Sequence, residues 1–296
     1  MLATAFAGSH PGAVSVSPSG RLLLVPSADQ TRLTILAVRT GRERSVDSRV
    51  ALGATPLWSP GSRRFSVSTP GGGVAVVDAA TGKARTVAAS SSGTTAYATG
   101  WSPDGSRLLV TRWTPTQPEL ELVDVASRTV EDLGTGADAA FSRDGTRIAY
   151  DANGATDVLN LDSGARTTVA SGRYPEHGLI TWSADGRELA YVEGDTSGRP
   201  NVLVAAAADG SGSRVMAAVP AVGGAPLWSG SRLVWLPRLG RGIAVGDPRT
   251  GATRVLLPRR AVGPLGVLAN GRIVYETNSR TLRTVEPDGR NDAPLA

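Results

Sequence analysis

The chain has 296 residues, of which 41% are hydrophobic and 19% charged, so it is globular and not intrinsically disordered. It contains no cysteine, which excludes disulfides, zinc–thiolate sites and cysteine nucleophiles. The formal net charge is +5, but the arginines are scattered and do not gather in patches with aromatic residues. We therefore expect no nucleic-acid partner.

No apolar run approaches the ~20 residues that a membrane-spanning helix needs, so we expect no membrane insertion by this chain. Residues 1–7 are short and lack the charged start of a signal peptide. One interpretation is that the chain begins after a leader or anchor that has been removed.

A turn followed by an apolar strand recurs from the beginning of the chain to its end. The clearest copy, residues 101–110, reads Trp-Ser-Pro-Asp-Gly-Ser-Arg-Leu-Leu-Val. Proline pre-sets φ and glycine accepts the positive φ of a tight reversal, so Pro103-Asp104-Gly105 predicts a turn. In chain order the copies begin at residues 16, 58, 101, 141, 182, 228 and 267.

A second unit follows each copy, in which a short apolar strand ends at a small polar turn and another strand begins. Residues 74–83 show it best, with Val-Ala-Val-Val-Asp followed by a Thr-Gly turn. Each period of 39 to 46 residues therefore holds four short strands, a to d. Four antiparallel strands at this period are typical of a β-propeller blade.

The predicted fold is all-β: a seven-bladed β-propeller with four antiparallel strands per blade, in one domain over residues 1–296. The expected blades span approximately residues 12–46, 54–88, 95–133, 137–170, 178–217, 224–257 and 263–295. Stacking the sheets radially would bury both faces of each, which accounts for the near-continuous apolar runs of strands b and c. The strand-like residues 2–7 could pair with the outer edge of the last blade, beside or in place of residues 291–295.

The Trp-Ser-Pro-Asp-Gly turn, followed by a strand ending in Asp-x-x-Thr-Gly, resembles the TolB-like, or PD40, class of WD40-like propeller repeats. The sixth copy departs from the pattern, because it lacks the proline and the aspartate. The resemblance implies a propeller alone, since the chain has no room for the extra α/β domain of TolB. It also implies a periplasmic, extracellular or cell-surface location, with the cytoplasm as the alternative.

The most distinctive residues of the repeat are expected to be structural. Trp58, Trp101, Trp182 and Trp228 share one position, which indicates packing between neighbouring blades. Asp104, Asp144 and Asp185 are expected to bond nearby backbone N–H groups and not to bind metal. Only two histidines occur in the chain. Strand a of each blade is expected to be the inner strand, next to the central channel, and Asp138 is the only acidic residue on these strands. We therefore predict no catalytic residues, no metal and no cofactor.

Function is expected in the loops that depart from the repeat. In a propeller the b–c and d–a loops share one face around the channel mouth, and exposed Trp, Tyr and Arg are residue types that anchor interfaces. The candidate partner-binding residues are Arg112, Trp113, Arg173, Tyr174, Glu176, His177, Glu193, Arg199, Arg238 and Arg241.

The sequence favours a non-enzymatic, monomeric domain that binds a protein or peptide segment of some acidic character, in the bacterial cell envelope. One alternative is a small-molecule lyase, isomerase or hydrolase at the channel mouth, using arginine with Glu176 and His177. Another is a sensor or docking domain of a larger membrane-anchored protein.

Overall fold

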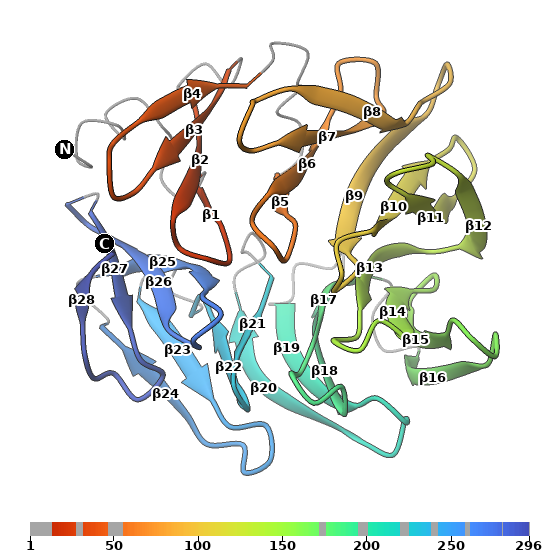
Figure 1. Ribbon diagram of the computed structural model, residues 1–296. Coiled ribbons are helices and arrows are strands. Elements are labelled where there is room, and N and C mark those ends of the chain that lie inside the picture. The colour runs from red at the N-terminus through yellow and green to blue at the C-terminus, as the bar shows by residue number, and fades with distance from the viewer. Residues whose placement is uncertain are drawn as a thin grey trace.

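The structure is a computed structural model that describes residues 14–27, 32–46, 56–171, 176–194, 201–219, 225–237, 242–257, 261–279 and 281–295, with the backbone alone for residues 176–178. Within these ranges the chain forms seven four-stranded antiparallel sheets arranged in a ring (Figure 1). This confirms the all-β seven-bladed propeller. None of the described residues forms a helix long and apolar enough to cross a membrane.

The strands follow one another within each sheet, so each blade is an up-and-down meander. The first three blades are β1 (Ser15–Val16), β2 (Leu22–Pro26), β3 (Leu33–Ala37) and β4 (Glu43–Ser45), then β5 (Leu57–Trp58), β6 (Arg64–Ser68), β7 (Val74–Asp78) and β8 (Ala84–Ala88), then β9 (Thr95–Trp101), β10 (Arg107–Trp113), β11 (Pro118–Asp124) and β12 (Val130–Thr135).

The other four blades continue the same order around the ring. They are β13 (Ala137–Phe141), β14 (Arg147–Asp151), β15 (Ala155–Asn160) and β16 (Arg166–Ser171), then β17 (Glu176–Trp182), β18 (Glu188–Gly194), β19 (Asn201–Ala207) and β20 (Ser213–Val219), then β21 (Leu227–Ser229), β22 (Arg232–Trp235), β23 (Ile243–Gly246) and β24 (Thr253–Leu256), and finally β25 (Ala261–Val267), β26 (Ile273–Thr277), β27 (Leu282–Val285) and β28 (Ala293–Pro294).

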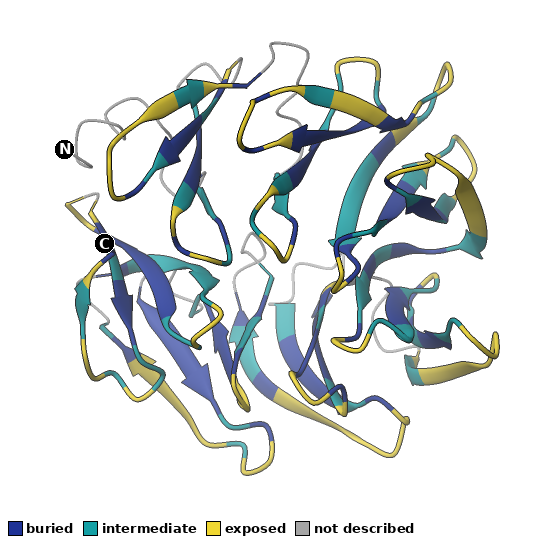
Figure 2. Cartoon of the chain, in the orientation of Figure 1, coloured by how far each residue is buried: buried dark blue, intermediate teal, exposed yellow. Residues whose placement is uncertain are grey.

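The core lies between the blades, because successive residues of a strand point to opposite faces of its sheet. In β10, Leu108 and Val110 pack with the second blade, whereas Leu109 packs with the fourth. Figure 2 shows the result: the middle strands of each blade are buried and much of the outermost strands is exposed. The apolar runs predicted for strands b and c therefore belong to two different interfaces.

The repeat tryptophans lie at these interfaces, and two of them show how one blade is joined to the preceding one. Trp101 Nε1 donates to the Leu57 carbonyl at 3.0 Å, and Trp182 Nε1 donates to the Ala140 carbonyl at 3.0 Å. An arginine of the preceding blade lies over each ring, with the Arg147 guanidinium 4.9 Å from the centroid of Trp182. The same guanidinium donates to the Gly186 carbonyl at 2.8 Å.

The arginines of the outer strands make a second set of contacts between blades. Arg44 donates to the Ala79 carbonyl at 3.2 Å, and Arg254 donates to the Pro287 carbonyl at 2.9 Å. Each carbonyl belongs to the turn that joins the last two strands of the next blade. Arginines that the sequence showed only as scattered charge thus hold neighbouring sheets together.

The turn aspartates bond their own turns, as expected. Asp104 Oδ1 accepts from Ser102 Oγ at 2.6 Å and from Ser106 N at 3.0 Å. These hydrogen bonds, led by that of Ser102, lower the pKa of Asp104 to about 2. Gly105 follows in the left-handed region at φ 71°, which the reversal requires.

The ring closes between the last blade and the first. Val274, Leu282 and Leu295 share a buried cluster with Val14 and Leu23. The Ala269 N–H also donates to the Pro18 carbonyl at 3.3 Å. β28 supplies the fourth strand of the last blade, so the outer strand predicted within residues 291–295 is present. Residues 2–7, the alternative closing strand, lie outside the described residues.

Candidate functional site

The structure describes only some of the binding residues predicted for the face made by the b–c and d–a loops. Arg112, Trp113 and Glu193 are described in full. Glu176 and His177 belong to β17, where their backbones pair with Gly194 and Glu193. The predicted residues outside the described ranges are Arg173, Tyr174, Arg199, Arg238 and Arg241.

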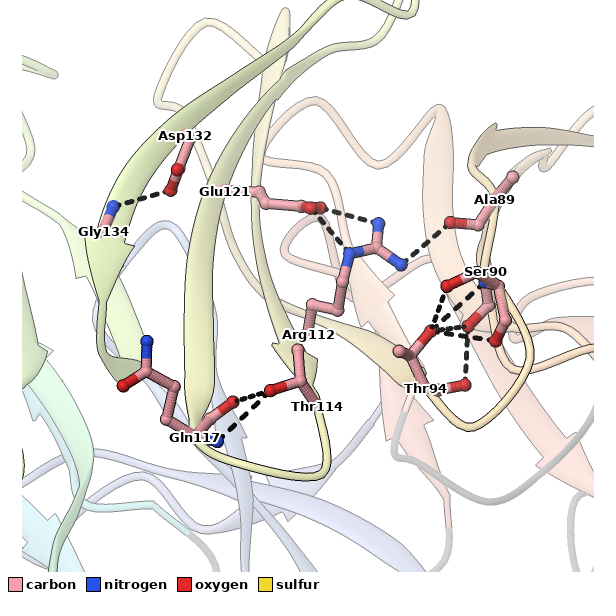
Figure 3. Close-up of polar contacts among 10 residues, drawn as sticks. Ala89, Ser90, Thr94, Arg112, Thr114, Gln117, Glu121, Asp132 and Gly134 are labelled. Atoms are coloured by element: carbon pink, nitrogen blue, oxygen red, sulfur yellow. Dashed lines mark hydrogen bonds and ion pairs between the residues drawn. The ribbon is translucent and has the colours of Figure 1, made fainter.

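Arg112, near the end of β10, is held on both sides. Its Nε and Nη2 donate to the two carboxylate oxygens of Glu121 at 2.7 and 2.9 Å, and Nη1 donates to the Ala89 carbonyl at 3.0 Å (Figure 3). The hydrogen bond with Glu121 is the main cause that raises the pKa of Arg112. The guanidinium therefore fastens the third blade to the second and has its charge neutralised in place.

The loop that follows Arg112 is closed by its own hydrogen bonds. Thr114 Oγ1 donates to the Gln117 carbonyl at 2.7 Å, and the Gln117 N–H donates back to Thr114 Oγ1 at 3.2 Å (Figure 3). The neighbouring loop is closed in a similar way, with Ser90 Oγ donating to the Thr94 carbonyl at 2.6 Å. Both loops thus present fixed surfaces.

Trp113 is the exposed one of the three predicted residues that the structure describes in full. Its side chain is 44% exposed, while its Nε1 donates to Tyr97 Oη at 2.5 Å. Tyr97 belongs to the adjacent strand β9, where it pairs with Thr111 of β10. Burial raises the pKa of Tyr97. The indole is therefore fixed at one edge and open to solvent elsewhere, an arrangement suited to receiving an apolar group.

Asp138 is a further candidate residue, which was not among the predicted binding residues. It lies on β13, in an irregular stretch between the Ala137–Asp151 and Ala140–Ala149 pairs, with φ at 49°. Burial, and then the charge of Asp151, raises the pKa of Asp138. Its charge also acts on Tyr97. The sequence feature that could have identified Asp138 is that it is an acidic residue on inner strands made mostly of small and apolar residues.

Glu193 is not an exposed contact residue. Its side chain is only 8% exposed, and its charge acts on the hydroxyl of Tyr191, two residues earlier in β18. Burial is the main cause that raises the pKa of Tyr191, and the charge of Glu193 adds to it. Glu193 lies two blades from Trp113, so the structure does not bring these two predicted residues together.

The described part of this face therefore offers the anchored indole of Trp113 and the half-buried carboxyl group of Asp138. The charge of Arg112 is neutralised and that of Glu193 is buried. Among the described residues, no group of three His, Asp or Glu side chains is placed to hold a metal ion.

No family model and no curated protein sequence matches the chain. Among solved structures, it is similar to a putative TolB from Agrobacterium tumefaciens at 17% identity and a TM-score of 0.53, over 68% of this chain and 78% of that one. TolB from Acinetobacter baumannii is 19% identical with a TM-score of 0.54, over 95% of this chain and 62% of that one. The chain has a TolB-like propeller fold.

The same fold carries other functions. An oligogalacturonate lyase in complex with manganese is 15% identical to the chain with a TM-score of 0.66, over 96% of this chain and 90% of that one. A TolB-like propeller is thus compatible with binding and with catalysis, and the choice between them must come from the residues of the site.

Proposed function

We propose that the protein is a non-enzymatic propeller that binds a protein or peptide through the face made by its b–c and d–a loops. Trp113 carries the proposal. Tryptophan is among the residues that contribute most to protein interfaces, and a ring already fixed loses little side-chain freedom on binding. Tyr97 holds the indole and the closed 114–117 loop flanks it.

The proposed partner places an apolar or aromatic side chain against Trp113. Arg112 contributes little to selecting an acidic segment, because Glu121 already neutralises its guanidinium. A preference for acidic segments would depend on Arg173, Arg199, Arg238 and Arg241. We propose a periplasmic, extracellular or cell-surface location, which rests on the resemblance of the repeat to TolB-like proteins.

The test is peptide selection against the whole chain, followed by affinity measurements with selected peptides. Trp113→Ala is expected to weaken binding by about thirtyfold, the effect of losing an interface anchor of ~2 kcal/mol. Val130→Ala is the matched control, because Val130 is 49% exposed on β12 of the same blade. Equal affinity of Trp113→Ala and wild type, with unfolding temperatures unchanged, would contradict the proposal.

A second candidate function, a small-molecule enzyme at the channel mouth, is favoured by Asp138. A carboxyl group with a raised pKa near a tyrosine is typical of acid–base chemistry. The two functions respond differently to Asp138→Asn, which would abolish turnover in an enzyme but leave peptide affinity unchanged in a binding protein.

A further inference from the structure

A pocket of about 430 Å³ lined by polar residues opens on the last blade. Figure 1 shows this blade, β25 to β28, across the ring from the blade of β9 to β12, to which Trp113 belongs. The volume of the pocket is within the range of small-molecule sites. It lies at the b–c loop of the last blade, on the same face as the site proposed above but four blades along the chain from Trp113, so it is a second site on that face. The lining residues are Tyr275, Thr277, Asn278, Ser279, Thr281, Arg283 and Asp292.

The alternation of side chains along β26 and β27 produces the pocket. Val274 and Leu282 pack towards the first blade, so Tyr275 and Arg283, which pair across the two strands, point to the opposite face. Near the turn between the first two strands that face is apolar, and there Ile273 packs on the sixth blade. Towards the b–c loop the same face becomes polar.

The polar groups are already ordered in two sets. Thr277 Oγ1 lies 2.9 Å from Ser279 Oγ and 2.7 Å from Thr281 Oγ1, and it accepts from the Thr281 N–H at 3.1 Å. Asp292 Oδ1 accepts from Tyr275 Oη and from Arg283 Nε, both at 2.7 Å. A ligand would therefore meet groups whose positions are fixed before it binds.

The chemistry of these groups indicates the class of ligand. Hydroxyl and amide groups both donate and accept hydrogen bonds, a guanidinium only donates, and a carboxylate only accepts. Every described lining side chain has a polar group, and the charges of Arg283 and Asp292 cancel. An ion would meet one like charge, whereas a ligand with adjacent hydroxyls can donate to Asp292 and accept from Arg283.

We propose that this pocket binds a neutral saccharide through adjacent hydroxyl groups. The experiment titrates the full chain with glucose, galactose and mannose separately, and with sulfate as an anion probe, by calorimetry or saturation-transfer NMR. Saturable binding of at least one sugar is expected. Ser279→Ala and Thr281→Val should each weaken it about fivefold, which corresponds to the loss of one hydrogen bond.

A matched control separates binding from folding. Thr69 occupies in the second blade the position that Thr277 has in the last, and its Oγ1 accepts from the Gly73 N–H at 3.0 Å. Thr277→Val should weaken sugar binding, whereas Thr69→Val should not, although each removes a loop hydrogen bond. The proposal is overturned if no sugar binds saturably, if sulfate binds in place of sugar, or if Ser279→Ala and Thr277→Val leave sugar affinity unchanged. Trp113→Ala should not affect sugar binding.

Discussion

Three tyrosines share one position in the second strand of their blades, yet each hydroxyl meets a different group. Tyr150 accepts from Arg166 Nη1 at 2.6 Å, Tyr191 experiences the charge of Glu193, and Tyr275 donates to Asp292 at 2.7 Å. All three rings are fully buried, and burial is the main cause that raises their pKa values. The repeat thus determines where each ring lies, while residues outside the repeat determine what its hydroxyl does.

Tyr275→Phe is expected to lower the free energy of unfolding by about 1 kcal/mol near neutral pH, because it removes the hydrogen bond to Asp292. Burial, and then Asp292, raises the pKa of Tyr275 from 10 to about 12. The native state therefore favours the neutral phenol, and this contribution is complete below pH 10 and is lost as pH rises towards 12. Denaturant melts of wild type and variant should converge above pH 10 and then cross, because a rise of the pKa from 10 to about 12 outweighs one hydrogen bond. A wild-type advantage that persisted at pH 12 would contradict this assignment.

The residues of the candidate site show what a repeat pattern can predict. Trp113 could be proposed because it interrupts the pattern, and the structure does expose it. The roles of Arg112 and Glu193 could not be predicted, because their partners Glu121 and Tyr191 are brought close by strand pairing and burial. A charge read from sequence shows whether a group can attract a partner, but not whether the fold has already neutralised it.

Among elements, the turn between the first two strands of a blade carries the contacts that fix the next blade. The residue that begins the second strand is Arg64, Arg107 or Arg147 in blades two to four, and each lies over the aromatic ring that ends the next inner strand. In the fifth blade Glu188 replaces this arginine. No cation is found over Trp228 among the described residues, and its buried Nε1 has no hydrogen-bond partner there.

Glu188→Arg is therefore expected to stabilise the protein by about 1 kcal/mol, by placing a guanidinium over Trp228. For a domain of this size that is a rise of about 2 °C in the unfolding temperature. Glu131→Arg, the same charge change at an exposed position on β12, should have a smaller effect. An equal rise for both variants would show that net charge, and not the interface, was responsible.

The pH dependence of Glu188→Gln gives a second measure of the same interface. Burial, and then Asp185 and Asp247, raises the pKa of Glu188, so folding favours its protonated form. The wild type loses this contribution as pH rises through the pKa of the native state. Glu188→Gln should therefore be more stable than wild type at pH 7, and the two should converge below about pH 4.5.

At the scale of the whole molecule, the number of blades was predictable because each period repeats the same turn and the same apolar strands. Seven buried clusters, one per interface, account for that regularity. The polar pocket of the last blade was not predictable, because it depends on an Arg283–Asp292 pair formed across its outer strands. The arginine contacts between blades were missed for the same reason, since nothing in the sequence states which carbonyl each guanidinium meets.

The arginine contacts have a consequence for how this ring should be unfolded. Each guanidinium stacks on a ring or donates to a carbonyl, and free guanidinium ions compete for both kinds of contact, whereas urea carries no charge. Because denaturant slopes in guanidinium chloride are about twice those in urea, the urea midpoint is ordinarily about twice the guanidinium midpoint. We expect a larger ratio here, and Arg64→Met with Arg147→Met should bring it back towards two. The ratio of the two midpoints would then measure how much the arginine contacts contribute to holding the blades together.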